Sequence, residues 1–180
     1  MKKLVEMSVS QLTVDPFTNM PIVILRDEAG KEAVPIWIGL PEASAIASQL
    51  DKIELRRPIA HDLMKTIIGE CGLRVDRVEV RDVKGNTFYA SIFLEREGSI
   101  IELDSRPSDA IALALRTGSS IRVARKVVEK TRKLGAQITT DDANARRGIT
   151  CGGDLDLHDA DRRPDILALL SDEDFGKWKM

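Results

Sequence analysis

The chain has 180 residues, 43% of them hydrophobic and 31% charged, and its 27 basic and 29 acidic side chains give a net charge of −2. This length and apolar fraction exclude a disordered chain and suit one compact domain with a core of its own. The net charge excludes a uniformly basic nucleic-acid binder, although it is compatible with a local basic patch.

The first part of the chain predicts three strands and two helices. They are expected at residues 1–14, 21–26, 34–38, 42–50 and 58–70. The alternation of the first strand slips at Ser10–Gln11, which indicates a bulge. Pro41 and Pro58 can each begin a helix, because proline at the first position lacks only an N–H that has no partner there. Leu63, Met64 and Ile67 form the expected apolar face of the second helix.

The pattern then starts again about 65 residues later, with a slip at Asp76–Arg77. Strands are expected at 73–80, 87–94 and 101–103, a helix at 108–116, a strand at 121–123 and a basic helix at 126–133. This repetition predicts an internal duplication of a βββα unit with the helix 58–70 inserted between the copies. A chance match between two amphipathic strand sets is the alternative. The fold class expected is mixed α/β, of the α+β kind, with a mostly antiparallel or mixed sheet.

The helix that follows Pro107 has six consecutive apolar residues, Ala110–Leu115, and therefore has no polar face for solvent. We expect it to be buried on all sides, between sheet layers. Beyond this point the composition changes. Residues 136–180 hold ten acidic and six basic side chains, which leaves 21 basic and 19 acidic in residues 1–135. We therefore predict a domain over 1–135 and an acidic, loosely ordered extension over 136–180, with a short helix near 165–170.

The sequence has no membrane or secretion signal. No stretch approaches 18 uncharged apolar residues, and MKKLVEMSVS lacks the apolar core of a signal peptide. Cys71 and Cys151 lie outside any C-x-x-C pattern, which excludes a disulfide framework and a cysteine-rich zinc site. With His61 and His158 as its two histidines, the chain also lacks a histidine-rich metal site. We expect a cytoplasmic protein that does not bind membranes.

Charged residues gather in three segments at strand ends or at helix starts. These are PIWIG with the following Glu42, the segment Arg57–Leu63, and the segment Asp104–Ile111. Each has a structural reading as well as a functional one. Glu42 and Asp109 can complement the helix dipole from a first turn, and Asp104 can be a turn former.

The remaining polar residues of these segments have the same two readings. Arg57 and Arg106 can be ion-pair partners of the carboxylates, and a lone His61 is more often structural than catalytic. Asp62 lies deeper than a capping position if its helix begins at Pro58. If the helix starts share one edge, the carboxylates could bind Mg²⁺ or Mn²⁺, whose preferred ligands are oxygens. The residues alone therefore indicate an acidic metal site flanked by arginines.

Four segments together carry a family resemblance: PIWIG with the acid and alanine after it, RPIAHDL, NTFYA and DSRPSDAIALALRTG. In this order and spacing the sequence resembles the bifunctional nuclease domain over about residues 1–130. The resemblance implies a mixed α/β fold, a homodimer, and nuclease activity on both DNA and RNA. The positions that match are Glu42, Arg57, His61, Asp62, Asp104, Arg106, Ser108 and Asp109.

The hypothesis that follows is a metal-dependent phosphodiester hydrolase acting on nucleic acid. Its catalytic residues would be His61, Asp62, Arg57, Arg106 and Asp109. Of these, Asp62 and Asp109 would hold the metal together with Asp104, with Glu42 as a further candidate ligand. His61 would act as general base or orient water, while Arg57, Arg106 and Ser108 would bind the substrate phosphates.

A non-enzymatic binding or regulatory module is the alternative, in which the same acids and arginines are structural. Aromatic residues make up only 4% of the chain, which leaves few side chains for stacking on bases.

Overall fold

One mixed sheet runs through the described part of this computed structural model, which comprises residues 3–15, 18–53, 55–85 and 87–141, with side chains described as far as residue 133. Its strands lie in the order β3-β2-β1-β7-β4-β5-β6, and all neighbours are antiparallel except β4 and β7. The strands are β1 (Leu4–Val14), β2 (Pro21–Asp27), β3 (Ala33–Trp37), β4 (Arg74–Lys84), β5 (Thr87–Arg96), β6 (Ser99–Ser105) and β7 (Ser120–Ala124). The mixed α+β fold is thereby confirmed.

Two three-stranded meanders, β1–β2–β3 and β4–β5–β6, flank β7 in this sheet. In β1 the register with β2 shifts between Val9 and Gln11. In β4 the register with β5 shifts between Val75 and Arg77. These two shifts lie where the alternation of the sequence slips, so both predictions are confirmed. A further shift in the pairing of β4 with β5, between Val80 and Asp82, adds to them. The duplication of a βββα unit stays a prediction.

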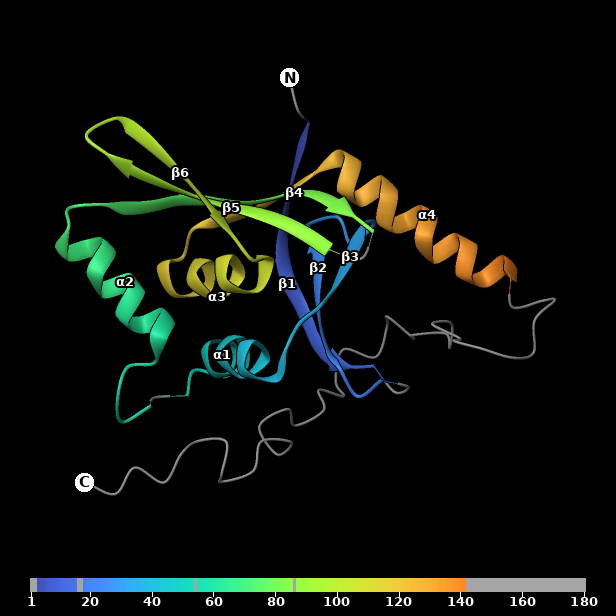
Figure 1. The fold of residues 1–180 in the computed structure, drawn as a ribbon, viewed down its shortest axis with the longest axis horizontal. Coiled ribbons are helices and arrows are strands. Elements are labelled where there is room, and N and C mark those ends of the chain that lie inside the picture. Colours follow the sequence, from blue (N-terminus) through green and yellow to red (C-terminus); the bar gives the residue numbers. More distant parts are fainter. Residues whose placement is uncertain (1–2, 16–17, 54, 86, 142–180) are drawn as a thin grey trace.

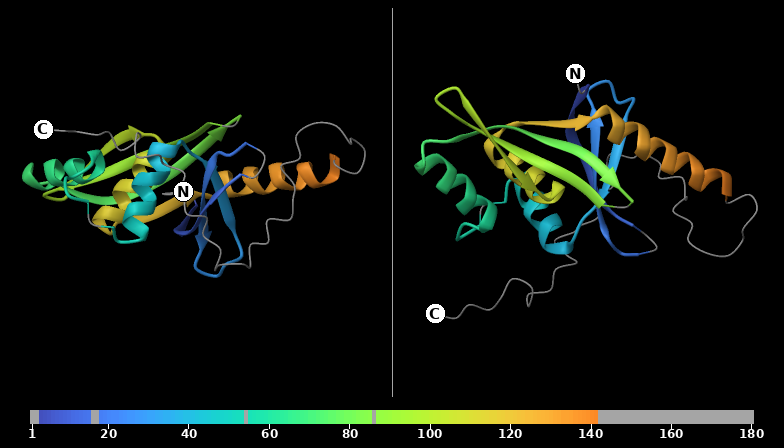
Figure 2. Two further views of the ribbon diagram at one scale, coloured as in Figure 1. Left: turned by 90° about the horizontal axis from the view of Figure 1, so that it is seen from below. Right: turned by 45° about the horizontal axis from the view of Figure 1, so that its top comes forward.

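The four helices are α1 (Leu40–Leu50), α2 (Ala60–Glu70), α3 (Pro107–Thr117) and α4 (Arg125–Asp141). Helices α1 and α2 both pack on α3, and α3 in turn packs on β4, β5 and β7 (Figure 1). Helix α4 packs on β3, β4 and β7, and it extends away from the other three helices (Figure 2). The starts of α1, α2 and α3 therefore belong to one helical layer.

Helix α3 is the centre of that layer. Pro107 lies in its first turn, and the chain leaves it at Gly118, which has a left-handed φ of 69° that suits glycine. Ala110, Ile111, Ala112 and Leu113 are fully buried, so the predicted burial is confirmed. The helix lies against one sheet, however, and not between two layers, because α1 and α2 cover its other side.

The apolar face expected on α2 is exposed to solvent in the structure. Leu63 and Ile67 are more than half exposed, and Met64 is 37% exposed. Helix α2 lies at the border of the helical layer, where it touches α3 and only a small part of β4. Ile68 of α2 and its N-cap residue Ile59 pack against the edge of the core instead.

Helix α4 continues to Asp141 and so crosses the domain boundary predicted at residue 135. The remainder of the predicted acidic extension, with the short helix expected near 165–170, lies outside the described residues. Among the helices that are described, none is long and apolar enough to span a membrane.

Candidate functional site

Four charged or titratable side chains from three helix starts form a connected group, which we call the His61 cluster. Arg106 donates from Nε to Oδ2 of Asp109 at 2.7 Å and from Nη2 to Oδ1 at 3.2 Å. Its Nη1 pairs with Oε1 of Glu42 at 2.8 Å. On the other side of Asp109, Nε2 of His61 lies 3.2 Å from Oδ1. The expected meeting of helix starts from separate segments is therefore observed for Glu42, His61, Arg106 and Asp109.

The local sequence explains why these side chains meet. Pro41 and Pro107 each lie in the first turn of a helix, which places Glu42 in the first turn of α1 and Asp109 in the first turn of α3. Arg106 is the extended N-cap residue of α3, so its side chain can fold back on Asp109. Gly39 has no side chain, which leaves room for the Glu42 carboxylate above it.

The cluster has one accessible cation and two shielded anions. The Arg106 side chain is 67% exposed, whereas Glu42 is 16%, His61 11% and Asp109 24% exposed. Burial alone raises the pKa of Asp109, but hydrogen bonds from Arg106 and His61 outweigh it, and the pKa lies below its usual value. The hydrogen bond to Asp109 raises the pKa of Arg106. Asp109 is therefore an ionised acceptor for the imidazole at neutral pH.

A second group, the Arg116 cluster, lies two turns further along α3. Arg116, with a side chain only 3% exposed, donates from Nε to Oδ1 of Asp62 at 2.6 Å. Its Nη1 donates to the carbonyls of Ala45 and Ala112 at 2.9 and 3.0 Å, and its Nη2 donates to Oγ of Ser48 at 3.4 Å. One buried guanidinium thus joins α1, α2 and α3.

Asp62 is a capping residue, which corrects the prediction that it lies too deep in its helix to cap. Helix α2 begins at Ala60 and not at Pro58, so Asp62 is its third residue and its Oδ2 accepts the N–H of Ile59 at 3.0 Å. Burial raises the pKa of Asp62, but the hydrogen bonds from Arg116 and from the Ile59 N–H are stronger together and lower it.

Asp104 lies apart from both clusters. In the pairing of β5 with β6, Leu103 faces Ile92 and Asp104 faces Ser91. Ile92 belongs to the core that α3 covers, so alternation along β6 places Leu103 on the helix side and Asp104 on the opposite face of the sheet. Ser108 is buried within α3, and Arg57 lies in the segment before α2.

These positions do not fit the predicted metal ligands. Asp62 is bound to Arg116, Asp109 shares Arg106 with Glu42, and Asp104 is separated from both by the sheet. Among the residues whose positions are described, no group of three or more His, Cys, Asp or Glu side chains is arranged to hold a metal ion.

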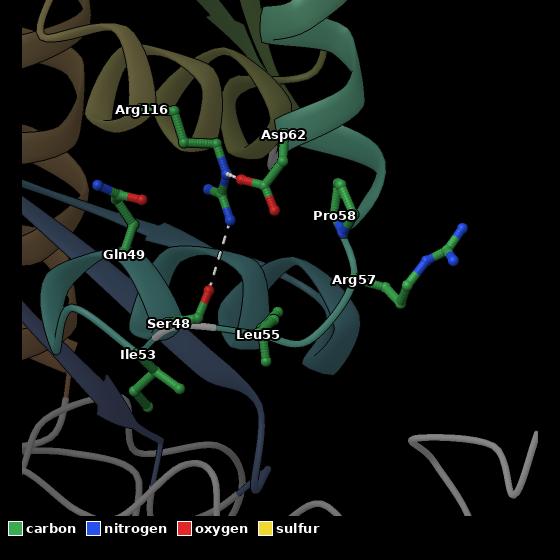
Figure 3. A pocket seen from close by; sticks show the side chains of 8 residues that line it. All are labelled: Ser48, Gln49, Ile53, Leu55, Arg57, Pro58, Asp62 and Arg116. Atoms are coloured by element: carbon green, nitrogen blue, oxygen red, sulfur yellow. Dashed lines mark hydrogen bonds and ion pairs between the residues drawn. The ribbon is translucent and has the colours of Figure 1, made fainter.

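A pocket of about 250 Å³ opens beside the Arg116 cluster (Figure 3). It lies between the end of α1, the segment that leads to α2 and the start of α2. Its lining consists of Ser48, Gln49, Ile53, Leu55, Arg57, Pro58, Asp62 and Arg116. Arg57, which the sequence indicated, is thus a pocket residue and not a member of the His61 cluster.

Comparison with known proteins decides the family. The family model described as the bifunctional nuclease domain matches residues 23–134. The chain belongs to the bifunctional nuclease domain family. An uncharacterized protein of Mycobacterium tuberculosis is 37% identical over 123 residues, which cover 68% of this chain and 73% of that protein.

Plant members of the family are also similar to this chain. Bifunctional nuclease 2 of Oryza sativa subsp. japonica is 29% identical over 59% of this chain and 34% of its own length. Bifunctional nuclease 1 of Arabidopsis thaliana is 27% identical over 57% of this chain and 33% of its own length. The similarity therefore spans about a third of each plant protein.

Sequence reasoning missed Arg116 in this bifunctional nuclease domain. Two features of the sequence could have indicated it. Arg116 is the first charged residue after a long apolar run in α3, and it follows Asp109 by seven residues, which places both on the same side of the helix. Its partner Asp62 is 54 positions away, so the contact itself depends on the packing of α2 against α3.

Lowering the pH should destabilise the domain through Asp62 and Asp109. Their folded pKa values lie below the unfolded value of about 3.9, so their stabilisation is complete above that pH and is lost as the pH falls through the folded pKa. We expect Asp62→Asn and Asp109→Asn to have lower melting temperatures than wild type at pH 7, with the gap narrowing below about pH 4. Circular-dichroism melts from pH 7 down to about pH 2 test this, and a gap that does not change with pH would contradict it.

Proposed function

We propose that this domain hydrolyses phosphodiester bonds of DNA and RNA at the His61 cluster. The observation that carries the proposal is the contact between His61 and the ionised Asp109, directly beside the exposed guanidinium of Arg106. The names of the plant relatives, which are bifunctional nucleases, support the same reaction class.

The three side chains have distinct roles in this proposal. Asp109 accepts a hydrogen bond from the Nε2–H of His61, which leaves Nδ1 as the ring nitrogen that can accept a proton from water. The water oxygen attacks phosphorus as its proton passes to Nδ1. The bond from phosphorus to the leaving oxygen breaks with its electron pair on that oxygen, which then takes the proton from Nδ1 and leaves as an alcohol. Three N–H groups of Arg106 contact Asp109 and Glu42. Its remaining N–H groups can bind the phosphate oxygens as negative charge develops on those oxygens during the reaction.

Mg²⁺ or Mn²⁺ stays a predicted cofactor without a matching ligand set among the described residues, and no step above uses one. The variant Asp104→Asn distinguishes a metal site that includes Asp104 from hydrolysis by the His61 cluster alone. The predicted metal ligands include Asp104, whereas the His61 cluster does not, so the cluster alone predicts that Asp104→Asn keeps its activity.

The test is cleavage of single- and double-stranded DNA and RNA by the purified full chain in Mg²⁺, Mn²⁺ or EDTA. We expect wild type and Asp104→Asn to cleave and Asp109→Asn to lose most of its activity. Cleavage that is equal in all three proteins would point to a contaminating nuclease and would overturn the proposal.

A non-enzymatic binding module is the second candidate, and one observation favours it. Each of Glu42, Asp62 and Asp109 is already paired with an arginine, as expected if these residues hold the helical layer together. Under this alternative the protein binds nucleic acid without cleaving it, and Asp109→Asn changes melting temperature but no hydrolytic rate.

We further propose that the protein is a cytoplasmic homodimer joined through β6. This strand is one of the two edges of the sheet, and Ile101 and Leu103 on its helix side are 44% and 43% exposed. A two-fold axis beside β6 would place Ile101 opposite Leu103 of the partner subunit and pair the free backbone groups of both edges.

The variant Ile101→Lys/Leu103→Lys should therefore be monomeric, because four buried lysines would replace the apolar contact. Leu63→Lys/Ile67→Lys on α2 is the matched control, with similarly exposed apolar residues away from β6, and it should remain dimeric. Light scattering after size exclusion measures the mass. A monomeric wild type, or equal dissociation of both variants, would contradict the β6 interface.

A further inference from the structure

The pocket beside the Arg116 cluster has a mixed lining that the hydrolysis proposal does not use. Gln49 and Ser48 contribute a carboxamide and a hydroxyl from the end of α1, and Ile53 and Leu55 contribute apolar side chains that are each 41% exposed (Figure 3). Pockets that enclose drug-sized ligands have about 300–1,000 Å³. At about 250 Å³ this pocket has room for one planar ring system and not for two.

The charge inside the pocket is balanced. Asp62 and Arg116 form an ion pair in its wall, and the carbonyls of Ala45 and Ala112 take up further donors of the guanidinium. A free anion would meet the Asp62 carboxylate, and a free cation would meet Arg116. The interior therefore favours an uncharged group that presents both hydrogen-bond donors and acceptors, as the edge of a nucleobase does.

The rim of the pocket, by contrast, carries the exposed guanidinium of Arg57. Arg57 lines the pocket, is exposed, and makes no hydrogen bond or ion pair with any residue that the structure describes. Its side chain points away from Asp62 and from the other labelled side chains (Figure 3). Such a guanidinium is suited to a phosphate that lies outside the pocket.

We propose that this pocket binds one unstacked base of single-stranded nucleic acid, with the adjoining phosphate on Arg57. Ile53 and Leu55 contact the face of the base, and Gln49 and the Asp62 carboxylate bind its edge. Only a base that is free of pairing can enter, so the pocket selects single strands over duplexes.

The pocket lies close enough to the His61 cluster for a bound base to position the strand for cleavage. This role in positioning rests on the proposed hydrolysis. Asp109 and Arg116 are seven residues apart on α3, which corresponds to about 10 Å along the helix axis. His61 and Asp62 are adjacent on α2. A base held in the pocket therefore places a neighbouring phosphodiester of the same strand near Arg106 and His61.

The test measures binding separately from cleavage, by fluorescence anisotropy with labelled single-stranded hexanucleotides, the same strands with abasic sites, and a hairpin duplex. We expect Gln49→Ala/Leu55→Ser to weaken binding of the base-containing strand about tenfold or more, because a base contact of this kind contributes about 1–3 kcal/mol. It should leave the abasic strand unchanged. Arg57→Gln should weaken the binding of both strands. It should also reduce the slope of the logarithm of the binding constant against log[salt] by about one.

Two matched controls exclude general surface effects. Arg56→Gln changes the neighbouring exposed arginine, which does not line the pocket, and Leu63→Ser changes an exposed leucine on α2. Both should bind as wild type does, and melting curves show that all variants are folded. Equal affinity for intact and abasic strands, or tighter binding of the duplex, would overturn the proposal that the pocket binds a base. Base-dependent binding without any cleavage would overturn the hydrolysis proposal but would support the proposal that the pocket binds a base.

Discussion

Replacing Arg116 with methionine should lower the free energy of unfolding by about 3–5 kcal/mol. The substitution removes a buried charge whose hydrogen bonds join three helices. It leaves the carbonyls of Ala45 and Ala112 without the guanidinium donor, and it leaves the Asp62 carboxylate with the Ile59 N–H but without its arginine. The loss of partners dominates the effect, because methionine nearly matches the volume of the arginine stem. Urea unfolding followed by circular dichroism measures it.

Two further variants test this interpretation of Arg116. Arg96→Met removes an exposed arginine at the end of β5 and should change the free energy of unfolding by less than about 0.5 kcal/mol. The double variant Arg116→Met/Asp62→Leu also removes the carboxylate that has lost its arginine. Its loss of unfolding free energy should therefore be smaller than the sum of the losses in the two single variants. Strict additivity would show that the ion pair does not couple α2 to α3.

The fold could be predicted from the sequence where the signal is local. Period-two alternation with a slip locates both bulges, and Pro41 and Pro107 mark the starts of α1 and α3. The insertion of β7 between β1 and β4 could not be predicted in this way, since a five-residue strand pairs with two partners that are far away in the sequence. The exposure of Leu63 likewise depends on how little of α2 the sheet covers.

The candidate site shows the same difference between local contacts, which the sequence predicts, and long-range contacts, which it does not. Arg106 and Asp109 are three residues apart at a helix start, so their pairing is a local property. His61 reaches Asp109 across 48 positions, and that contact depends on where α2 packs. Asp104 and Asp109 are five residues apart in the sequence, which predicts that they lie close together. The alternation of β6 turns the Asp104 side chain to the opposite face of the sheet, and nearness in sequence is therefore misleading at a strand end.

Replacing His61 with glutamine should lower kcat by about 10²–10⁴-fold, the usual contribution of a general base. Glutamine can still donate a hydrogen bond to Asp109, so the packing of α2 on α3 is kept while the proton acceptor is lost. KM should change little, because Arg106 and Arg57 remain. Lys65→Ala, an exposed change on the same helix, is the control and should retain full activity. Added imidazole should restore part of the rate in His61→Ala, which a purely structural role of His61 does not predict.

Combining His61→Gln with Asp109→Asn then tests whether the two residues act as a unit. If Asp109 works by holding the imidazole, Asp109→Asn lowers kcat in the wild-type background but adds little once His61 is glutamine, since groups that act together are strongly non-additive. If Asp109 instead acts mainly by fixing Arg106, its loss lowers kcat by the same factor in both backgrounds, and Arg106→Lys reproduces it. The size of the coupling therefore decides which of its two hydrogen-bond partners gives Asp109 its role in hydrolysis.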